Sequence, residues 1–344
     1  MSTRSPTPLK FLFPGWFAIV MGLCGLSLAF HRAAPLMGEL AGAVGLVIGA
    51  LAALVFIVLV AASAVRGQRY PEAWAEDRRH PVRHTFIATL PIALLLLATV
   101  AVAAGLHASP LRAGVAALWW VGSILQFFIT WWVLSRWWKG PQAGGLQWAS
   151  ATPALFIPIV GNVLAPLAGV PLGLEPWAAA QFGVGLLFWP VVMILLVVRI
   201  AVQGLWPERL LPTTFIFIAP PAVVGLSALQ LGAPLLVGWA LWGMALFSMV
   251  WCAALARRIA AMPFGLPHWG MSFPLAAMAA LTLRLVPAEG AARAPMTLAG
   301  IALLALAALL IAALVLATLR GLRDGSLLAP EPVAPIVAAP AAPQ

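Results

Sequence analysis

The side chains that could carry acid–base, metal or redox chemistry are few in this chain of 344 residues, and they stand far apart. The five histidines show no metal-ligand spacing, and the two cysteines stand inside apolar runs without a Cys-x-x-Cys pattern. We therefore expect no catalytic centre, no bound metal and no cofactor, and the chain is not expected to be an enzyme. The nine carboxylates all fall in expected loops, at helix ends or in the C-terminal tail: Glu39, Glu72, Glu76, Asp77, Glu175, Glu208, Glu289, Asp324 and Glu331.

The composition is that of a membrane protein. Hydrophobic residues make up 63% of the chain and charged residues 8%, whereas soluble domains carry about 25% charged residues. The formal net charge is +10, but the basic residues sit in short clusters between apolar runs and form no stripe that could follow a phosphate backbone. We expect an integral protein of the lipid bilayer with no nucleic-acid partner.

The apolar runs predict an all-α fold with ten membrane crossings. A helix needs about 20 apolar residues to cross the hydrocarbon core. The sequence predicts a cytoplasmic N-terminus over residues 1–12, one transmembrane domain over 13–322, and a disordered Ala/Pro-rich tail over 323–344. The ten expected spans are 13–31, 40–64, 85–106, 113–135, 151–172, 177–199, 213–230, 235–256, 267–286 and 296–319.

The distribution of Lys and Arg predicts the orientation. Among the 19 basic residues, all but Arg32, Arg112, Arg284 and Arg293 lie on the side of the N-terminus. Because basic loops stay in the cytoplasm, both termini are expected to be cytoplasmic in a multi-pass protein of a bacterial inner membrane.

Proline is unevenly distributed among the expected helices. Interior prolines are concentrated in the odd-numbered spans, and helix 1 carries instead a stripe of small residues, Gly15, Ala18, Gly22, Gly25 and Ala29. A proline kink frees a backbone carbonyl that protein or water must shield, so we expect odd helices inside and even helices outside, as five hairpins. The alternative is that prolines are simply common in membrane helices. The interior prolines are Pro91, Pro158, Pro166, Pro220, Pro221 and Pro274, with Pro190 in an even helix.

Five stretches on the odd helices resemble one known family. They are PGWFAIVMGLCGLSLAF (14–30), HPVRHTFIATLPI (80–92), TPALFIPIVGN (152–162), FIAPPAVVGLSAL (217–229) and HWGMSFPLAAMA (268–279). The chain is similar in them to the bacterial tellurite-resistance and dicarboxylate transporter family, which includes the plant slow anion channels. The resemblance implies five hairpins around a pseudo-fivefold axis, a pore through each protomer, inner helices kinked by proline, and a homotrimer.

The resemblance also implies a gate. The family places an occluding phenylalanine in helix 9, and the residue that stands there is Phe273. Its expected pore-facing neighbours are Ala18, Gly22 and Ala219, carried over from the same resemblance. The kinked helices are expected to line the pore near Pro91, Pro158, Pro220 and Pro274, with Asn162 facing the interior.

Basic residues at the two mouths could favour anions. The candidates are Arg32, Arg284 and Arg293 outside and Arg83 and Arg136 inside. The alternative is that each is an interface anchor that extends its charge to the headgroups.

The sequence therefore favours a channel-like pathway for small anions, closed by Phe273. Within the same family, the alternatives are a proton-coupled carrier of four-carbon dicarboxylates such as malate and a tellurite or sulfite exporter. A structural membrane protein without transport is a third reading. The absence of carboxylates from the middle of the spans argues against proton coupling.

Overall fold

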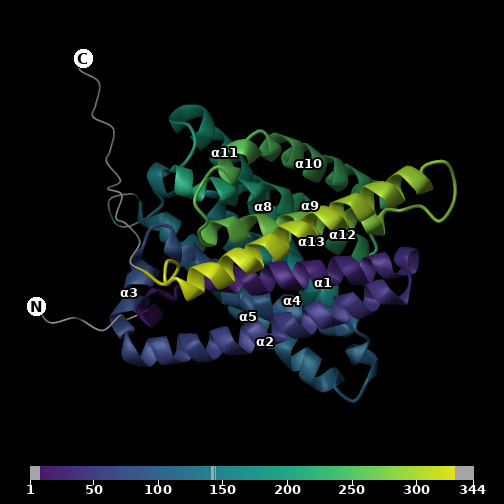
Figure 1. Cartoon of the computed structure of the whole chain (residues 1–344), viewed down its shortest axis with the longest axis horizontal. Coiled ribbons are helices and arrows are strands. Elements are labelled where there is room, and N and C mark those ends of the chain that lie inside the picture. Colours follow the sequence, from purple (N-terminus) through teal and green to yellow (C-terminus); the bar gives the residue numbers. More distant parts are fainter. Residues whose placement is uncertain (1–7, 141–142, 144, 330–344) are drawn as a thin grey trace, which may run out of the picture.

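Every regular element in the described part of the chain is a helix (Figure 1). The computed structural model describes residues 8–140, 143 and 145–329. Eight helices are long and apolar enough to cross a membrane by length and composition, which supports the prediction of an all-α, multi-pass membrane protein. Most of the predicted disordered tail, from residue 330 onward, and residues 1–7 of the predicted N-terminus lie outside the described residues.

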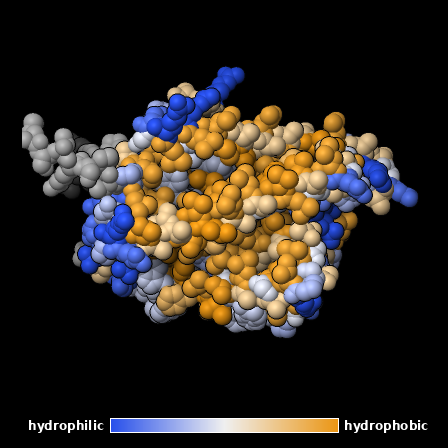
Figure 2. All heavy atoms as spheres, turned by 60° about the horizontal axis from the view of Figure 1, so that its bottom comes forward, coloured by the Kyte–Doolittle hydropathy of each residue, from blue (hydrophilic) through white to orange (hydrophobic). Residues whose placement is uncertain are grey.

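Five long helices form the outside of the molecule. Their apolar side chains are largely exposed, and only between 22% and 39% of the most apolar stretch of each is buried. Figure 2 shows the result, a broad apolar face with polar side chains gathered towards its ends. These outer helices are α2 (Glu39–Arg69), α5 (Arg112–Ser135), α8 (Glu175–Gln203), α10 (Leu235–Ala253) and α13 (Arg293–Arg323).

Between them lie five segments in which 3-10 turns precede or interrupt α-helix. We call these the inner segments. They are η2–α1 (Pro14–Phe17, Ala18–Met37), η3–α4 (Arg83–Ala88, Thr89–Ala103), η8–α6–η9–α7 (Pro153–Leu155, Phe156–Val160, Gly161–Leu164, Ala165–Gly169), η10–α9 (Glu208–Ile218, Ala219–Gln230) and η11–α12 (Leu266–Met271, Ser272–Arg284). The remaining elements are η1 (Pro8–Phe11), α3 (Pro71–Arg79), η4 (Leu106–Ala108), η5 (Arg136–Lys139), η7 (Trp148–Ser150) and α11 (Ala256–Ala260).

The inner prolines stand where α-helix begins. Pro91, Pro158 and Pro274 are each the third residue of an α-helical stretch, and Pro220 and Pro221 are the second and third of α9. Proline is tolerated in the first turn of an α-helix, because its fixed φ suits the helical backbone there. The prolines thus mark the change from 3-10 to α geometry, and the bend expected at them stays a prediction.

The inner segments pack against one another in a closed order. Helix α1 contacts α4, α4 contacts α7, α7 contacts α9, α9 contacts α12, and α12 contacts α1. Each inner segment also packs against the outer helix that follows it in the chain. Burial follows the predicted alternation, because the apolar stretch is 61% buried in Pro14–Met37, 72% in Arg83–Ala103 and 94% in Glu208–Gln230.

Candidate functional site

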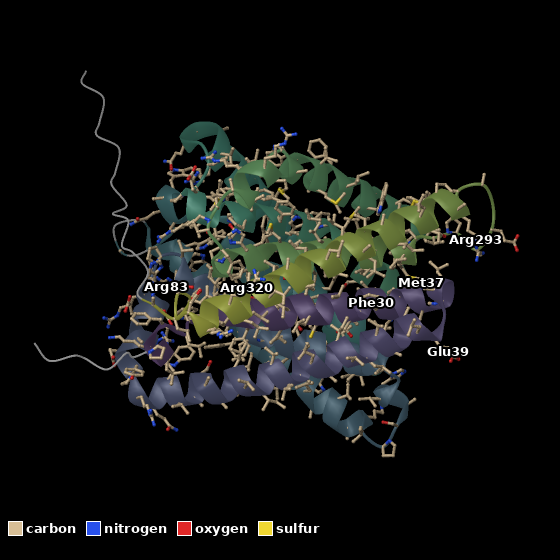
Figure 3. The ribbon with its side chains drawn as sticks, in the orientation of Figure 1. Phe30, Met37, Glu39, Arg83, Arg293 and Arg320 are labelled. Carbon is tan, nitrogen blue, oxygen red and sulfur yellow. The ribbon has the colours of Figure 1, made fainter. Side chains whose placement is uncertain are left out.

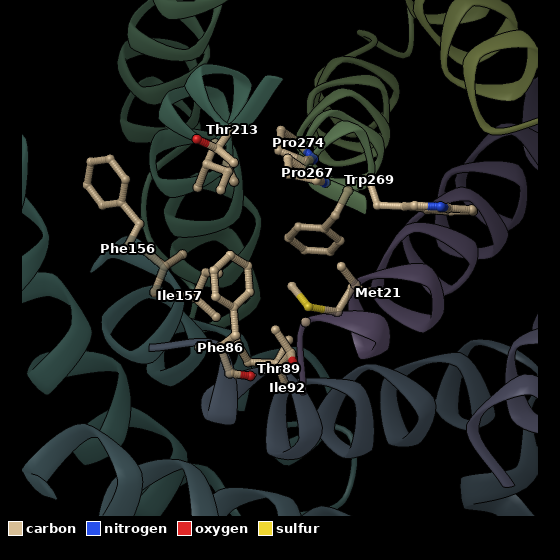
Figure 4. Close-up of a pocket in the computed structure, with 18 of the residues that line it drawn as sticks. Met21, Phe86, Thr89, Ile92, Phe156, Ile157, Thr213, Pro267, Trp269 and Pro274 are labelled. Atoms are coloured by element: carbon tan, nitrogen blue, oxygen red, sulfur yellow. Dashed lines mark hydrogen bonds between the residues drawn. The ribbon is translucent and has the colours of Figure 1, made fainter. Parts of the chain in front are cut away.

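A cavity of about 70 Å³ lies among the inner segments, and all five contribute to its wall (Figure 4). The lining residues come from the first half of η2–α1, η3–α4 and η11–α12, and from nearer the middle of η8–α6–η9–α7 and η10–α9. They are Phe13, Gly15, Ala18, Met21, Phe86, Thr89, Ile92, Phe156, Ile157, Val160, Gly161, Leu164, Thr213, Ile216, Ala219, Leu266, Pro267, Trp269, Gly270, Phe273 and Pro274.

In four of the five inner segments, lining positions recur every three residues. A 3-10 helix has three residues per turn, so side chains three apart lie directly above one another. In η3–α4 these positions are Phe86, Thr89 and Ile92, which Figure 4 shows grouped on one side of the cavity. The 3-10 turns and the first α-helical turn after them therefore give these four segments one narrow face towards the cavity. The same spacing occurs in Gly15, Ala18 and Met21, in Thr213, Ile216 and Ala219, and in Pro267, Gly270 and Phe273.

The polar groups of the wall are already hydrogen-bonded to the protein. The Thr89 hydroxyl lies 2.7 Å from the Pro14 carbonyl and 2.6 Å from the Phe86 carbonyl, and donates its proton to one of them. The Thr213 hydroxyl donates to the Leu210 carbonyl at 2.6 Å. An ion in this cavity would therefore meet an apolar wall and lose much of its hydration without replacement.

Phe273 contributes its ring to this wall, and 8% of the residue is exposed. The ring lies against the backbone of α1: a Cβ placed on Gly25 would come 3.0 Å from Phe273 Cδ2 and 3.1 Å from Ala276 Cβ. Gly22 lies one turn before Gly25 and packs against Ser272 of α12. A Cβ placed on Gly22 would come 2.3 Å from Ser272 Oγ. Within the small-residue stripe of helix 1, Gly22 and Gly25 thus form the surface on which α12 packs.

The predicted pore-lining residues divide into two groups. Ala18, Ala219 and Pro274 line the cavity together with Phe273. The other five, Gly22, Pro91, Pro158, Asn162 and Pro220, are outside its lining. Sequence reasoning did not identify the aromatic and β-branched lining residues of the 3-10 turns, although their spacing of three was available as a signal.

Asn162 was predicted to face the interior pathway, but its side chain lies among polar side chains of neighbouring helices. Its side chain is fully buried, donates to Thr130 Oγ1 at 2.7 Å, and accepts from Gln181 Nε2 at 3.2 Å. Gln126 of α5 donates to the Pro158 carbonyl at 2.7 Å within the same cluster. These polar side chains join the third inner segment to α5 and α8, so the predicted orientation of Asn162 is corrected.

The five predicted mouth arginines are at opposite ends of the molecule, as Figure 3 shows for Arg83 and Arg293. Arg136 donates to the Arg78 carbonyl at 2.6 Å and lies over the Trp132 ring. Within the described residues, Arg32 at the end of α1 and Arg284 at the end of α12 have no carboxylate within ion-pair distance.

A buried ion pair near Arg83 was not predicted. Arg66 Nη1 lies 2.8 Å from Asp77 Oδ2, with the two side chains 2% and 0% exposed. Arg66 also donates to the Lys10 carbonyl at 3.0 Å. The pair therefore ties α2 and α3 to the segment that leads into η2.

No group of three or more His, Cys, Asp and Glu side chains that could hold a metal occurs within the part of the chain that the structure describes. The wall of the cavity also contains no such side chain. The arrangement offers space, shape and an apolar surface.

A helical membrane protein with an apolar cavity enclosed by its inner segments has the architecture of a membrane transport protein. Residues 12–319 match the SLAC1 family of voltage-dependent anion channels, and the chain belongs to this family. The predicted resemblance is thereby confirmed.

Similarity to individual proteins agrees with this family assignment. The chain is 28% identical over 283 residues to the tellurite resistance protein TehA homolog of Haemophilus influenzae, a match that covers 81% of this chain and 82% of that protein. It is 27% identical over 214 residues to the S-type anion channel SLAH2 of Arabidopsis thaliana, covering 62% of this chain and 40% of the plant protein. The chain is also 24% identical over 214 residues to a second channel of Arabidopsis thaliana, the S-type anion channel SLAH3. This match covers 62% of this chain and 33% of the plant protein.

Proposed function

We propose that this protein conducts small anions across the membrane through a channel-like pathway between the five inner segments, and that Phe273 closes it. The observation that carries the proposal is the cavity wall, to which every inner segment contributes and in which Phe273 takes part. Membership of an anion-channel family supplies the class of solute.

All five inner segments cross the membrane in this proposal, which gives ten crossings around a pseudo-fivefold pore. Two of them, Pro153–Gly169 and Leu266–Arg284, are not among the eight long apolar helices. A 3-10 turn rises about 2.0 Å per residue against about 1.5 Å in an α-helix. The two segments then span about 29 and 32 Å, close to the roughly 30 Å of a hydrocarbon core.

The carbonyls of the third inner segment support an anion pathway because side chains of other helices hydrogen-bond them. Gln126 donates to the Pro158 carbonyl at 2.7 Å, Trp119 donates to the Ala165 carbonyl at 3.0 Å, and Ser227 donates to the Val163 carbonyl. A carbonyl that faced the pathway would repel an anion, so its capture by a neighbouring helix removes that barrier.

The basic mouths supply the attraction in this account. Arg32, Arg284 and Arg293 lie on one side, and Arg83 and Arg136 lie on the other. An anion would approach through a positive potential and then cross an apolar constriction. The N- and C-termini are proposed to be cytoplasmic in the bacterial inner membrane, and the protein is proposed to be a homotrimer.

Two related activities are the alternatives. The Haemophilus relative is named for tellurite resistance, which favours tellurite or sulfite export as a second candidate. A proton-coupled dicarboxylate carrier needs a titratable group on the pathway, and the cavity wall has none.

Currents from reconstituted protein under an anion gradient, with chloride, nitrate, sulfite, tellurite and malate in turn, test the proposal. Currents that follow the anion gradient without a pH gradient support the channel. Transport that requires a pH gradient would establish the carrier, and no flux of any of these anions would reject transport.

A further inference from the structure

We infer that Phe13 and Phe86 form a second constriction of the same pathway, in series with Phe273. The inference rests on the proposed anion pathway and adds to it a barrier nearer the beginning of the inner segments. Both rings line the cavity. Their centroids are 5.8 Å apart and their planes meet at 89°, the edge-to-face arrangement that aromatic pairs prefer.

The two constrictions occupy different positions along the inner segments. Phe86 is the first lining residue of η3–α4, and Phe13 is the first of the N-terminal segment. Phe273 and the adjacent Pro274 are the last lining residues of η11–α12. Because the chain returns through an outer helix after each inner segment, the inner segments all run in the same direction. Phe86 stands three residues before the α-helical start at Thr89, and Phe273 stands one residue after the α-helical start at Ser272. The two positions therefore differ by about 7 Å along the direction of the segments.

A glycine makes the position of the Phe13 ring possible. A Cβ placed on Gly15 would come 2.3 Å from Phe13 Cε2 and 2.7 Å from Phe13 Cζ. Real Cβ atoms do not approach so closely, so any other residue at position 15 would displace the ring. Gly15 itself lines the cavity, and its lack of a side chain leaves the aromatic ring to fill this part of it.

Charged residues of the preceding loop fix the aromatic pair. The Arg83 guanidinium carbon lies 5.9 Å from the centroid of Phe13, and Arg83 is one 3-10 turn before Phe86. Arg83 Nη1 lies 3.5 Å from Asp77 Oδ1. The other oxygen of Asp77 binds the buried Arg66 at 2.8 Å. A cation is thereby held over the face of the ring, where the ring quadrupole attracts it.

Two barriers in series make a distinctive prediction for the current. In the wild-type protein the larger barrier dominates, so Phe86→Ala alone should change the anion current less than twofold. Once Phe273→Ala has removed that barrier, the aromatic pair becomes the main resistance. Adding Phe86→Ala should then raise the current several-fold above that of Phe273→Ala. Phe247→Ala serves as the matched control, because Phe247 is 69% exposed on α10, outside the cavity wall.

Modification of a cysteine in the cavity gives an independent readout that needs no current. Ala219→Cys is introduced after Cys24→Ala and Cys252→Ala have removed the two buried native thiols. A membrane-impermeant methanethiosulfonate is applied from the side of Arg83, and the modification rate is measured on folded protein. Phe86→Ala should raise this rate about tenfold, and Phe86→Leu should give an intermediate rate.

The two experiments separate this inference from the proposed gate. If Phe273→Ala leaves the current flat while Phe86→Ala speeds thiol modification, the gate at Phe273 fails and the second constriction stands. An unchanged modification rate in Phe86→Ala, with wild-type folding, overturns the second constriction. A double-variant current equal to that of Phe273→Ala overturns it as well.

Discussion

The ring of Phe273 rests on the backbone of Gly25, with only 3.0 Å between Phe273 Cδ2 and the position that a Cβ on Gly25 would occupy. Contacts this short are rarer than ordinary van der Waals packing, so the glycine sets where the ring can lie. The contact joins α1 to α12 at the point where α12 borders the cavity. The proposed gate is therefore held by a neighbouring helix as well as by its own backbone.

A methyl group at position 25 should displace the ring. We expect Gly25→Ala to lower the free energy of unfolding by about 1 kcal/mol, and less in a Phe273→Ala background, where the close contact with the ring is gone and only that with Ala276 Cβ remains. Thermal unfolding of the two single variants and the double variant measures the coupling. Gly183→Ala is the control, because nothing lies within 4 Å of a Cβ at that position. Additive effects of the two substitutions would contradict the contact.

The Asn162 cluster should matter for stability and leave ion selectivity unchanged. Asn162→Ala removes hydrogen bonds to Thr130 and Gln181 and leaves buried groups without partners, at a cost of about 1–3 kcal/mol. Thermal unfolding should show the loss, and reversal potentials should keep their wild-type order among anions. A changed order at equal amounts of folded protein would place Asn162 on the pathway.

The three acids of α3 should respond differently to substitution. The sequence predicts that changes at Glu72, Glu76 and Asp77 leave transport largely intact, since none lies within a span. The structure distinguishes them: Glu72 and Glu76 are 59% and 63% exposed, and Asp77 is fully buried against Arg66. We expect Asp77→Asn to reduce the free energy of unfolding by about 3–5 kcal/mol, because it leaves a buried guanidinium unpaired.

The same measurement supplies the controls. Glu72→Gln and Glu76→Gln remove only exposed charges, so each should stay within about 0.5 kcal/mol of the wild type. Equal effects of all three substitutions on thermal unfolding would contradict a special role for the Arg66–Asp77 pair.

Reporter tags test the proposed orientation. The loop between α12 and α13 carries Arg293 at the end opposite Arg83 (Figure 3). A tag inserted in that loop should be accessible from outside the cell, and tags at both chain ends should be protected. Termini on opposite sides would make the number of crossings odd, and the ten-crossing arrangement would fail.

Length and hydropathy predicted the membrane class because they are properties of whole segments. The family was predicted from the resemblance of five sequence stretches to known members. The resemblance also placed Phe273 and Ala219 among residues that line the cavity. Sequence reasoning missed Phe86 and Ile216 because the candidates were taken from the resemblance and from the interior prolines, and these two residues lie in the 3-10 turns that precede the α-helices. The interior prolines were expected to mark kinks. They stand where the 3-10 turns change to α-helix.

Polar partners could not be read from the sequence. Asn162 could have faced either the cavity or another helix, and only the positions of Thr130 and Gln181 decide between them. Asp77 was assigned to a loop by its neighbours in sequence, and its burial depends on α2 and α3 folding together. Such contacts join residues on different elements, and local patterns do not encode them.

The anion current per folded protomer tests the central claim most directly, compared among wild type, Phe273→Leu and Phe273→Ala. If Phe273 closes an apolar pathway, removing its ring lowers both the steric barrier and the cost of dehydrating the ion. We predict a strong increase in current for Phe273→Ala, an intermediate current for Phe273→Leu, and an unchanged preference among anions. A flat or falling series at equal amounts of folded protein would contradict the gate.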